Sequence, residues 1–207
     1  MGTSRFKDII TYEKLKEHLK ISNAICYISG TGSGKSYWVE NILYKHGRVL
    51  FVTSRRSKLD QDLNHVDTTW NINEILNEQN DCHHLLTNHG LASIVKSATI
   101  FRDDGFPENY CLDQYINLFD YIVIDEVHSI ISDASFSDDV CMVQYFMEYA
   151  VDMGKNVIVL TATDKLLEDY FEIYKNNECL RASEARQSRA YGAGRARFFC
   201  FGNDLQK

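Results

Sequence analysis

The sequence lacks any long hydrophobic run. Its 207 residues are 44% hydrophobic, but no stretch approaches the roughly 18 consecutive apolar residues that a membrane-spanning helix requires. The first 20 residues, MGTSRFKDIITYEKLKEHLK, also lack the apolar centre of a signal peptide. We therefore expect an intracellular, cytoplasmic protein with no membrane partner.

Closely spaced cysteines are missing as well. The six cysteines are scattered along the chain without any C-x-x-C pair. This distribution argues against a disulfide framework and against a zinc site, and it favours buried thiols in a reducing compartment. The segment DCHH at 81–84 comes nearest to a metal cluster, but it has no distant second pair of ligands.

Positive charge is scarce except near the C-terminus. The chain as a whole carries 22 Lys and Arg against 29 Asp and Glu, whereas the stretch 176–207 carries 6 against 3 and shows little apolar periodicity. The acidic excess argues against indiscriminate coating of nucleic acid and leaves room for local basic patches. We predict one domain over residues 1–175, followed by an Arg-rich tail of uncertain structure over 176–207.

Apolar segments alternate between the spacing of strands and the spacing of helices. Such alternation predicts an α/β fold in which a parallel sheet is sandwiched between helices. The predicted strands are 24–29, 48–54, 84–87, 121–125 and 156–163, and the predicted helices include one around 12–19, one ending at Gly47, one from about 137 to Gly154, and one at 164–174.

A glycine-rich loop joins the first of these strands to a helix. Its sequence, SGTGSGKS at 29–36, predicts a polyphosphate site, because bare backbone N–H groups at a helix N-terminus attract phosphate oxygens. Lys35 is expected to reach the β- and γ-phosphates, and the Ser36 hydroxyl is expected to hold Mg²⁺. The pattern G-x-x-x-x-G-K-[ST] calls for glycine at the first position, where this chain has Ser29. The residues expected to contact the nucleotide are Gly30, Thr31, Gly32, Ser33, Gly34, Lys35 and Ser36.

A pair of acids follows the apolar run YIVI at 121–124. Asp125 ends this strand, and a buried carboxylate is costly unless a cation or metal compensates it; Mg²⁺ bound through Ser36 would do so. Glu126, one residue further, is expected to take a proton from an attacking water. His128 completes a D-E-x-H pattern.

These motifs resemble those of one helicase family. SGTGSGKS, DEVH at 125–128 and TAT at 161–163 follow the order and approximate spacing of motifs I, II and III of superfamily 2 helicases of the DEAH type, and TSRRSKLDQ at 53–61 resembles motif Ia. The segment LLTNHGL at 85–91 lies where a further nucleic-acid-contacting motif is expected. The resemblance implies a RecA-like P-loop NTPase fold over residues 24 to about 165, with ATP and Mg²⁺ as cofactors.

The resemblance also implies roles for residues outside the phosphate loop. His128, Thr161 and Thr163 would couple the γ-phosphate to bound nucleic acid, and Thr161 and Thr163 would lie between Lys35 and Asp125. Thr53, Ser54 and Arg55 would contact the phosphates of one strand of single-stranded or duplex nucleic acid, without reading its sequence.

Two expected features of such helicases are not recognisable. The upstream glutamine motif is absent, and only about 40 residues follow TAT, too few for the second RecA-like domain that brings arginines to the γ-phosphate. The favoured interpretation is a first motor domain that binds and slowly hydrolyses Mg·ATP and does not unwind nucleic acid alone. The alternative is a nucleotide-binding interaction or regulatory module, a helicase remnant without translocase activity.

Overall fold

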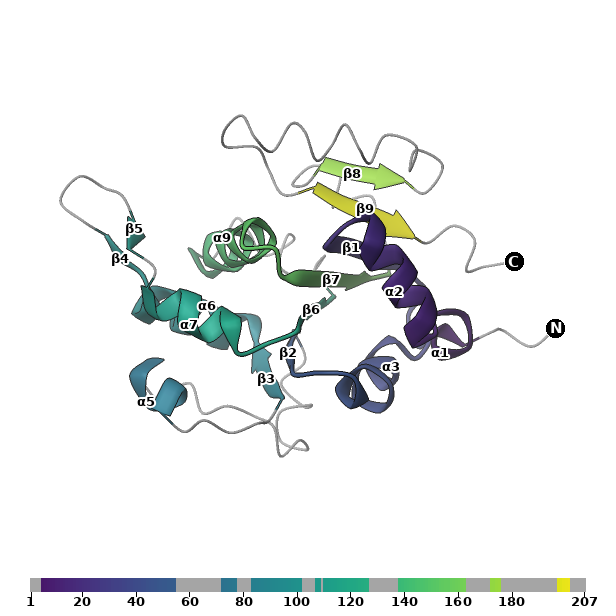
Figure 1. The fold of residues 1–207 in the computed structure, drawn as a ribbon, viewed down its shortest axis with the longest axis horizontal. Helices are drawn as coiled ribbons and strands as arrows, with labels where there is room; N and C mark the ends of the chain where they lie inside the picture. Colours follow the sequence, from purple (N-terminus) through teal and green to yellow (C-terminus); the bar gives the residue numbers. More distant parts are fainter. Residues whose placement is uncertain are drawn as a thin grey trace.

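The computed structural model describes residues 5–54, 72–77, 83–101, 107–108, 110–126, 138–162, 172–175 and 197–201. Seven strands form one sheet in the order β3-β2-β6-β7-β1-β9-β8, and every neighbouring pair in it is parallel (Figure 1). The strands are β1 (Ala24–Ile28), β2 (Val49–Thr53), β3 (His84–Thr87), β6 (Tyr121–Asp125), β7 (Asn156–Thr161), β8 (Glu172–Lys175) and β9 (Arg197–Phe201). A separate antiparallel pair joins β4 (Ile100–Phe101) to β5 (Pro107–Glu108).

Helices cover both faces of the sheet, so the predicted parallel sheet between helices is confirmed. Side chains alternate along each central strand between two hydrophobic clusters, one packed against α1 to α3 and the other against α5 to α9 (Figure 1). The helices are α1 (Phe6–Ile9), α2 (Tyr12–Ile21), α3 (Lys35–Asn41), the 3₁₀ helix η1 (Leu43–Lys45), α5 (Ile72–Asn77), α6 (Asn88–Ala98), α7 (Tyr110–Asn117) and α9 (Asp138–Asp152).

The central strands are apolar on both sides because both sides are covered. In β6 all five residues are buried, and in β2 likewise. A parallel sheet with helices on both faces leaves no side of these strands for water, so the sequence shows a continuous apolar run instead of alternation. The polar residue at the end of such a run therefore marks the carboxyl end of the strand, as Asp125 does in β6.

The N-terminal helix α1 packs against the two elements that the glycine-rich loop connects, β1 and α3. Phe6 lies edge-on against Tyr27 of β1 and Trp38 of α3, with ring centroids 5.6 and 5.5 Å apart. Trp38 is fully buried, and its indole Nε1 donates a hydrogen bond to the carbonyl of Ile10 at 2.6 Å. These aromatic contacts tie α1 and α3 together on one face of the sheet.

Two predicted boundaries differ from the observed ones. The helix after the glycine-rich loop ends at Asn41 and continues as η1 before Gly47, because the last residues tighten into a 3₁₀ turn. The predicted helix at 164–174 is wrong at its end, since Glu172–Lys175 form β8 and pair with β9. Strand pairing with β9 outweighs the helical preference of this segment; 163–171 lie outside the described residues.

Residues 197–201 of the predicted Arg-rich tail form β9. This strand pairs in parallel with β1, with Ile25 opposite Phe199. The strand that leads into the glycine-rich loop is therefore flanked on both sides, by β7 and by β9. Within the described part of the chain, no helix combines the length and the apolar character needed to cross a membrane.

Candidate functional site

The glycine-rich loop connects β1 to α3 and turns sharply twice. Gly32 and Gly34 have φ angles of +75° and +93°, in the left-handed region that side-chain-bearing residues rarely adopt. Gly34 is the residue immediately before α3, so its conformation aims the first backbone N–H groups of the helix into the loop. No atom lies within 4 Å of the place where a Cβ would be at Gly30, Gly32 or Gly34, so the space above the loop is open.

The loop is fixed to its neighbours by backbone hydrogen bonds. Phe6 N–H of α1 donates to the carbonyl of Ser33 at 2.9 Å, and Ser29 N–H donates to the carbonyl of Thr161 at the end of β7 at 3.0 Å. Because α1 and β7 are themselves packed into the core, these bonds hold both arms of the loop in place.

Lys35 points back into the loop that precedes it. Its Nζ donates hydrogen bonds to the carbonyls of Ser29 at 2.6 Å and Gly30 at 3.1 Å, and the residue is only 8% exposed. Backbone carbonyls thus orient the ammonium group at the mouth of the loop. Lys35 is the only cationic residue among the described residues that line the adjacent cavity.

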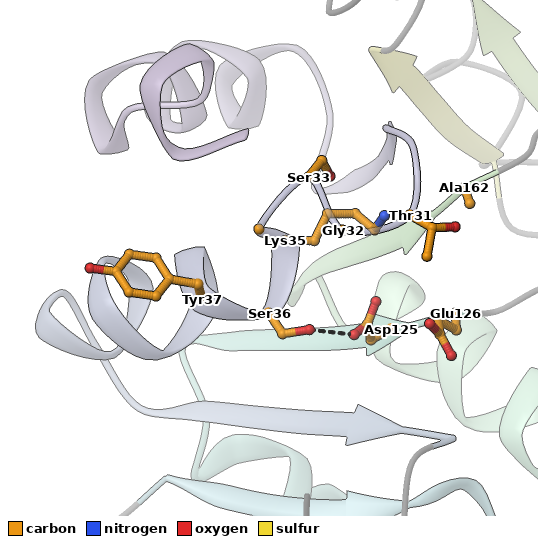
Figure 2. Close-up of a pocket in the computed structure, with 10 residues that line it drawn as sticks. Thr31, Gly32, Ser33, Lys35, Ser36, Tyr37, Asp125, Glu126 and Ala162 are labelled. Carbon is orange, nitrogen blue, oxygen red and sulfur yellow. Dashed lines mark hydrogen bonds between the residues drawn. The ribbon is translucent and has the colours of Figure 1, made fainter. Parts of the chain in front are cut away.

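The loop meets the end of β6 through one side-chain hydrogen bond. Ser36 Oγ donates to Oδ2 of Asp125 at 2.9 Å, which joins residues 89 positions apart in the sequence (Figure 2). Asp125 is 3% exposed. The two oxygen-bearing side chains predicted to share one Mg²⁺ ion are therefore in direct contact.

Glu126 leaves the strand in an unusual conformation. Its φ is +56°, and it is the only non-glycine residue with positive φ among those described. Its backbone N–H donates to the carbonyl of Leu160 in β7 at 2.9 Å, whereas its carboxylate Oε2 accepts a hydrogen bond from Ser54 Oγ at 2.8 Å. The backbone and the side chain of Glu126 are thus held by different neighbouring strands.

A cavity of about 170 Å³ lies between the loop and the acids. Figure 2 shows Ser36 and Asp125 facing one another at its floor, with Glu126 on the far side of Asp125 from Ser36. The loop contributes the opposite wall. The residues that line the cavity are Thr31, Gly32, Ser33, Gly34, Lys35, Ser36, Tyr37, Asp125, Glu126 and Ala162.

The possible metal ligands at this cavity suit a Mg²⁺ ion bound together with phosphate, and they do not suit a metal ion that only protein side chains coordinate. Among the described residues no group of three or more His, Cys, Asp or Glu side chains could hold a metal ion. Mg²⁺ sites at phosphates need no such group, since the ion takes one or two protein oxygens and completes its coordination with phosphate and water. The hydroxyl of Ser36 and the carboxylate of Asp125 supply such a pair, both of them hard oxygen ligands.

Of the remaining predicted site residues, three belong to the described part of the chain and three do not. Thr161 ends β7, is fully buried, and lies between the strand of the loop and the strand of the acids, because β7 pairs with β1 and β6. Thr53 is also fully buried, and Ser54 bonds to Glu126. The predicted roles of these three residues stay predictions. Arg55, His128 and Thr163 lie outside the described residues.

A second cavity was not foreseen from the sequence. It has a volume of about 320 Å³, lies against the same loop, and is lined by Arg5, Lys7 and Tyr37 together with Gly32, Ser33 and Gly34. Tyr37 is 49% exposed, and Lys7 Nζ lies 5.1 Å from the centre of its ring. An exposed aromatic ring with cations beside it suits a flat or anionic group. The one sequence signal for it is the position of Tyr37 directly after GKS.

Comparison with protein families identifies the family to which a chain with this loop, these acids and this sheet belongs. A family model described as "Type III restriction enzyme, res subunit" matches residues 5–166. The chain belongs to the type III restriction enzyme res-subunit family. The matched range contains the loop, both acids and every strand from β1 to β7.

Membership of the res-subunit family confirms the resemblance to superfamily 2 helicases. The matched region is a superfamily 2 RecA-like helicase domain, and the parallel sheet with β7 between β1 and β6 agrees with it. None of the curated proteins matches the chain in sequence.

Proposed function

We propose that this res-subunit family domain binds Mg·ATP at the cavity between the loop and β6, and hydrolyses it. The observation that carries the proposal is the 2.9 Å hydrogen bond between Ser36 and Asp125. It brings a hydroxyl at the N-terminus of α3 against a buried carboxylate at the end of β6. A hydroxyl and a carboxylate next to a phosphate-binding loop are the protein ligands of Mg²⁺ in P-loop NTPases.

Each residue of the cavity has a distinct part in this proposal. The backbone N–H groups from Gly30 to Ser36 bind the phosphates, and Lys35 leaves its carbonyl partners to contact the β- and γ-phosphate oxygens. Ser36 and Asp125 would hold a Mg²⁺ ion, and such an ion would supply positive charge against the phosphates. Glu126 accepts the proton of the attacking water.

The proposal extends to nucleic acid and to a second domain. Superfamily 2 helicase domains act on nucleic acid, so we propose a DNA or RNA strand as the partner of the segment that begins at Thr53, and a D-E-x-H subtype motif that ends at His128. Hydrolysis by residues 1–207 is expected to be slow, because Lys35 is the only cation among the described residues that line the cavity. An arginine supplied by a second RecA-like domain accelerates related phosphoryl transfers by roughly 10³ to 10⁵.

The test is nucleotide binding by Lys35→Ala. Loss of a charge-assisted contact of about 3 kcal/mol lowers ATP affinity roughly 100-fold in the presence of Mg²⁺. The matched control is Lys16→Ala, which removes an exposed lysine that pairs only locally with Glu13. Isothermal calorimetry on both variants checks the prediction, and equal ATP affinity of Lys35→Ala and the parent would refute the phosphate site.

A further inference from the structure

Glu126 lines the cavity at the phosphate loop, and its carboxylate is bonded on the side of β6 that faces away from β7. In the sheet, β6 lies between β2 and β7, and β1 with the loop lies beyond β7. Ser54, the partner of the Glu126 carboxylate, directly follows β2. The hydrogen bond of 2.8 Å therefore draws the carboxylate toward β2, whereas Lys35 is reached in the direction of β7 and β1.

The register of the strands explains why these two residues meet. Val52 of β2 is opposite Ile124 of β6, so the positions two residues further on, Ser54 and Glu126, leave the sheet side by side. The backbone of Glu126 continues the pairing with β7 through its bond to the carbonyl of Leu160. Only the side chain turns to the other neighbour.

The backbone of Glu126 reflects the same arrangement. A φ of +56° is uncommon for a residue with a long side chain, and it persists only where surrounding contacts impose it. Two contacts do so here: the N–H bond to β7 and the carboxylate bond to Ser54. Strained residues of this kind concentrate at sites where a group is held ready to move.

We infer that Ser54 is a positioning residue whose hydrogen bond restrains the carboxylate of Glu126 toward β2 within the cavity, on the side of β6 away from β7. The inference rests on the proposed function, in which Glu126 is the general base. A hydroxyl that donates to an ionised carboxylate forms a strong, charge-assisted bond. The carboxylate keeps a second oxygen that can accept the proton, but the bond to Oε2 opposes its turning toward a water at the phosphates, so it slows hydrolysis in the state described here.

The experiment compares kcat and KM for ATP hydrolysis by the full chain and its variants, measured by phosphate release. Ser54→Ala removes the donor and is expected to raise kcat about 3- to 10-fold with an unchanged KM, since one hydrogen bond restrains the base and the phosphate contacts remain. Ser54→Thr keeps a hydroxyl at the same position, and its kcat is expected to lie well below that of Ser54→Ala.

Two controls separate restraint from a structural effect. Ser93→Ala makes the same chemical change on the exposed side of α6, where the hydroxyl bonds the carbonyl of His89, and is expected to leave kcat unchanged. The double variant Ser54→Ala with Glu126→Gln is expected to be as inactive as Glu126→Gln alone, because Ser54 acts through the carboxylate.

The outcomes distinguish this inference from the proposed function. A kcat for Ser54→Ala that is equal to or lower than that of the parent overturns the inference, and so does a gain that persists when Glu126 is replaced. Full hydrolysis by Glu126→Gln alone overturns instead the assignment of the general base.

Discussion

The two ends of the parallel sheet carry polar groups of different kinds. At the ends where β1, β2 and β6 finish, charged groups face a cavity: Lys35, Asp125 and Glu126. At the opposite ends, where β3 and β6 begin, the buried polar side chains are uncharged and paired with one another, and the charged residues Arg48 and Asp120 lie just outside the strands. Hydroxyls of Tyr12 and Tyr121 lie 3.0 Å apart.

Buried histidine shows this difference most clearly. His84 begins β3, is 9% exposed, and its Nδ1 lies 3.3 Å from the hydroxyl of Tyr115. Burial, with smaller contributions from the charges of Arg48 and His83, lowers the pKa of His84 to about 4. Burial likewise raises the pKa of Tyr115. Both groups are therefore uncharged at neutral pH.

The comparison teaches that burial alone does not identify a functional group. His84 and Asp125 are both buried polar residues at the end of a strand. A buried neutral group satisfied by its neighbours stabilises the core, whereas a buried carboxylate beside an open cavity requires a cation to complete it. The cavity and the phosphate loop beside Asp125 make the difference.

The largest effect is expected on kcat for ATP hydrolysis, from Glu126→Gln at the end of the sheet that faces the cavity. Loss of a general base lowers kcat by about 10² to 10⁴, while Mg·ATP binding persists because the phosphate and metal ligands are intact. Glu148→Gln on α9 is the matched control, since an amide there can still accept from Gln144. Phosphate release and calorimetry measure the two quantities, and loss of binding in Glu126→Gln would contradict the assigned division of roles.

A smaller effect is expected from Asp125→Asn, which alters the Mg²⁺ requirement of ATP binding. Replacing the carboxylate removes a charged ligand, so the Mg²⁺ concentration required for half-maximal ATP binding rises about 10- to 100-fold. Asp152→Asn, at the exposed end of α9, provides the control. Titration with Mg²⁺ at fixed ATP checks the shift, and an unchanged requirement would contradict the role of Asp125 as a metal ligand.

The smallest effect is expected on the free energy of unfolding, through protonation of His84 at the opposite end of the sheet as the pH falls. The unfolded chain takes up a proton on His84 near its ordinary pKa of 6.5, whereas the folded protein does so only near 4. Stability due to neutral His84 is therefore complete above pH 6.5 and is lost as the pH falls toward 4. At pH 5 the loss is about 2 kcal/mol.

Urea unfolding at pH 7 and pH 5 tests this expectation. His84→Gln cannot titrate, so its free energy of unfolding should fall less between the two pH values than that of the parent, whatever other groups contribute. Nucleotide binding at pH 7 should be the same in both proteins. If the two proteins lost the same stability, the low pKa of His84 would be wrong.

The sequence predicted the turn between β1 and α3 and the position of the acids at the end of β6, whereas phosphate binding by the loop stays a prediction. SGTGSGKS is a contiguous motif, so the turn at Gly34 and the start of α3 at Lys35 follow from local residue types. The contact between Ser36 and Asp125 was predicted through a shared ion, and the structure shows it as a direct hydrogen bond. The second cavity at Arg5, Lys7 and Tyr37 was missed, because Arg5 and Lys7 lie at the start of α1 and Tyr37 lies in α3, and the three share no motif.

The sequence by itself determined the kind of sheet and the polar residues at the carboxyl ends of its strands. Apolar runs such as YIVI, each ending in a polar residue, are legible locally because burial on both faces demands them. Tertiary structure alone decided the order of the strands, the pairing of β9 with β1, and the partner of Glu126. Strand order and register arise from packing between distant segments, so no local pattern could show that Ser54, 72 residues before Glu126, holds its carboxylate.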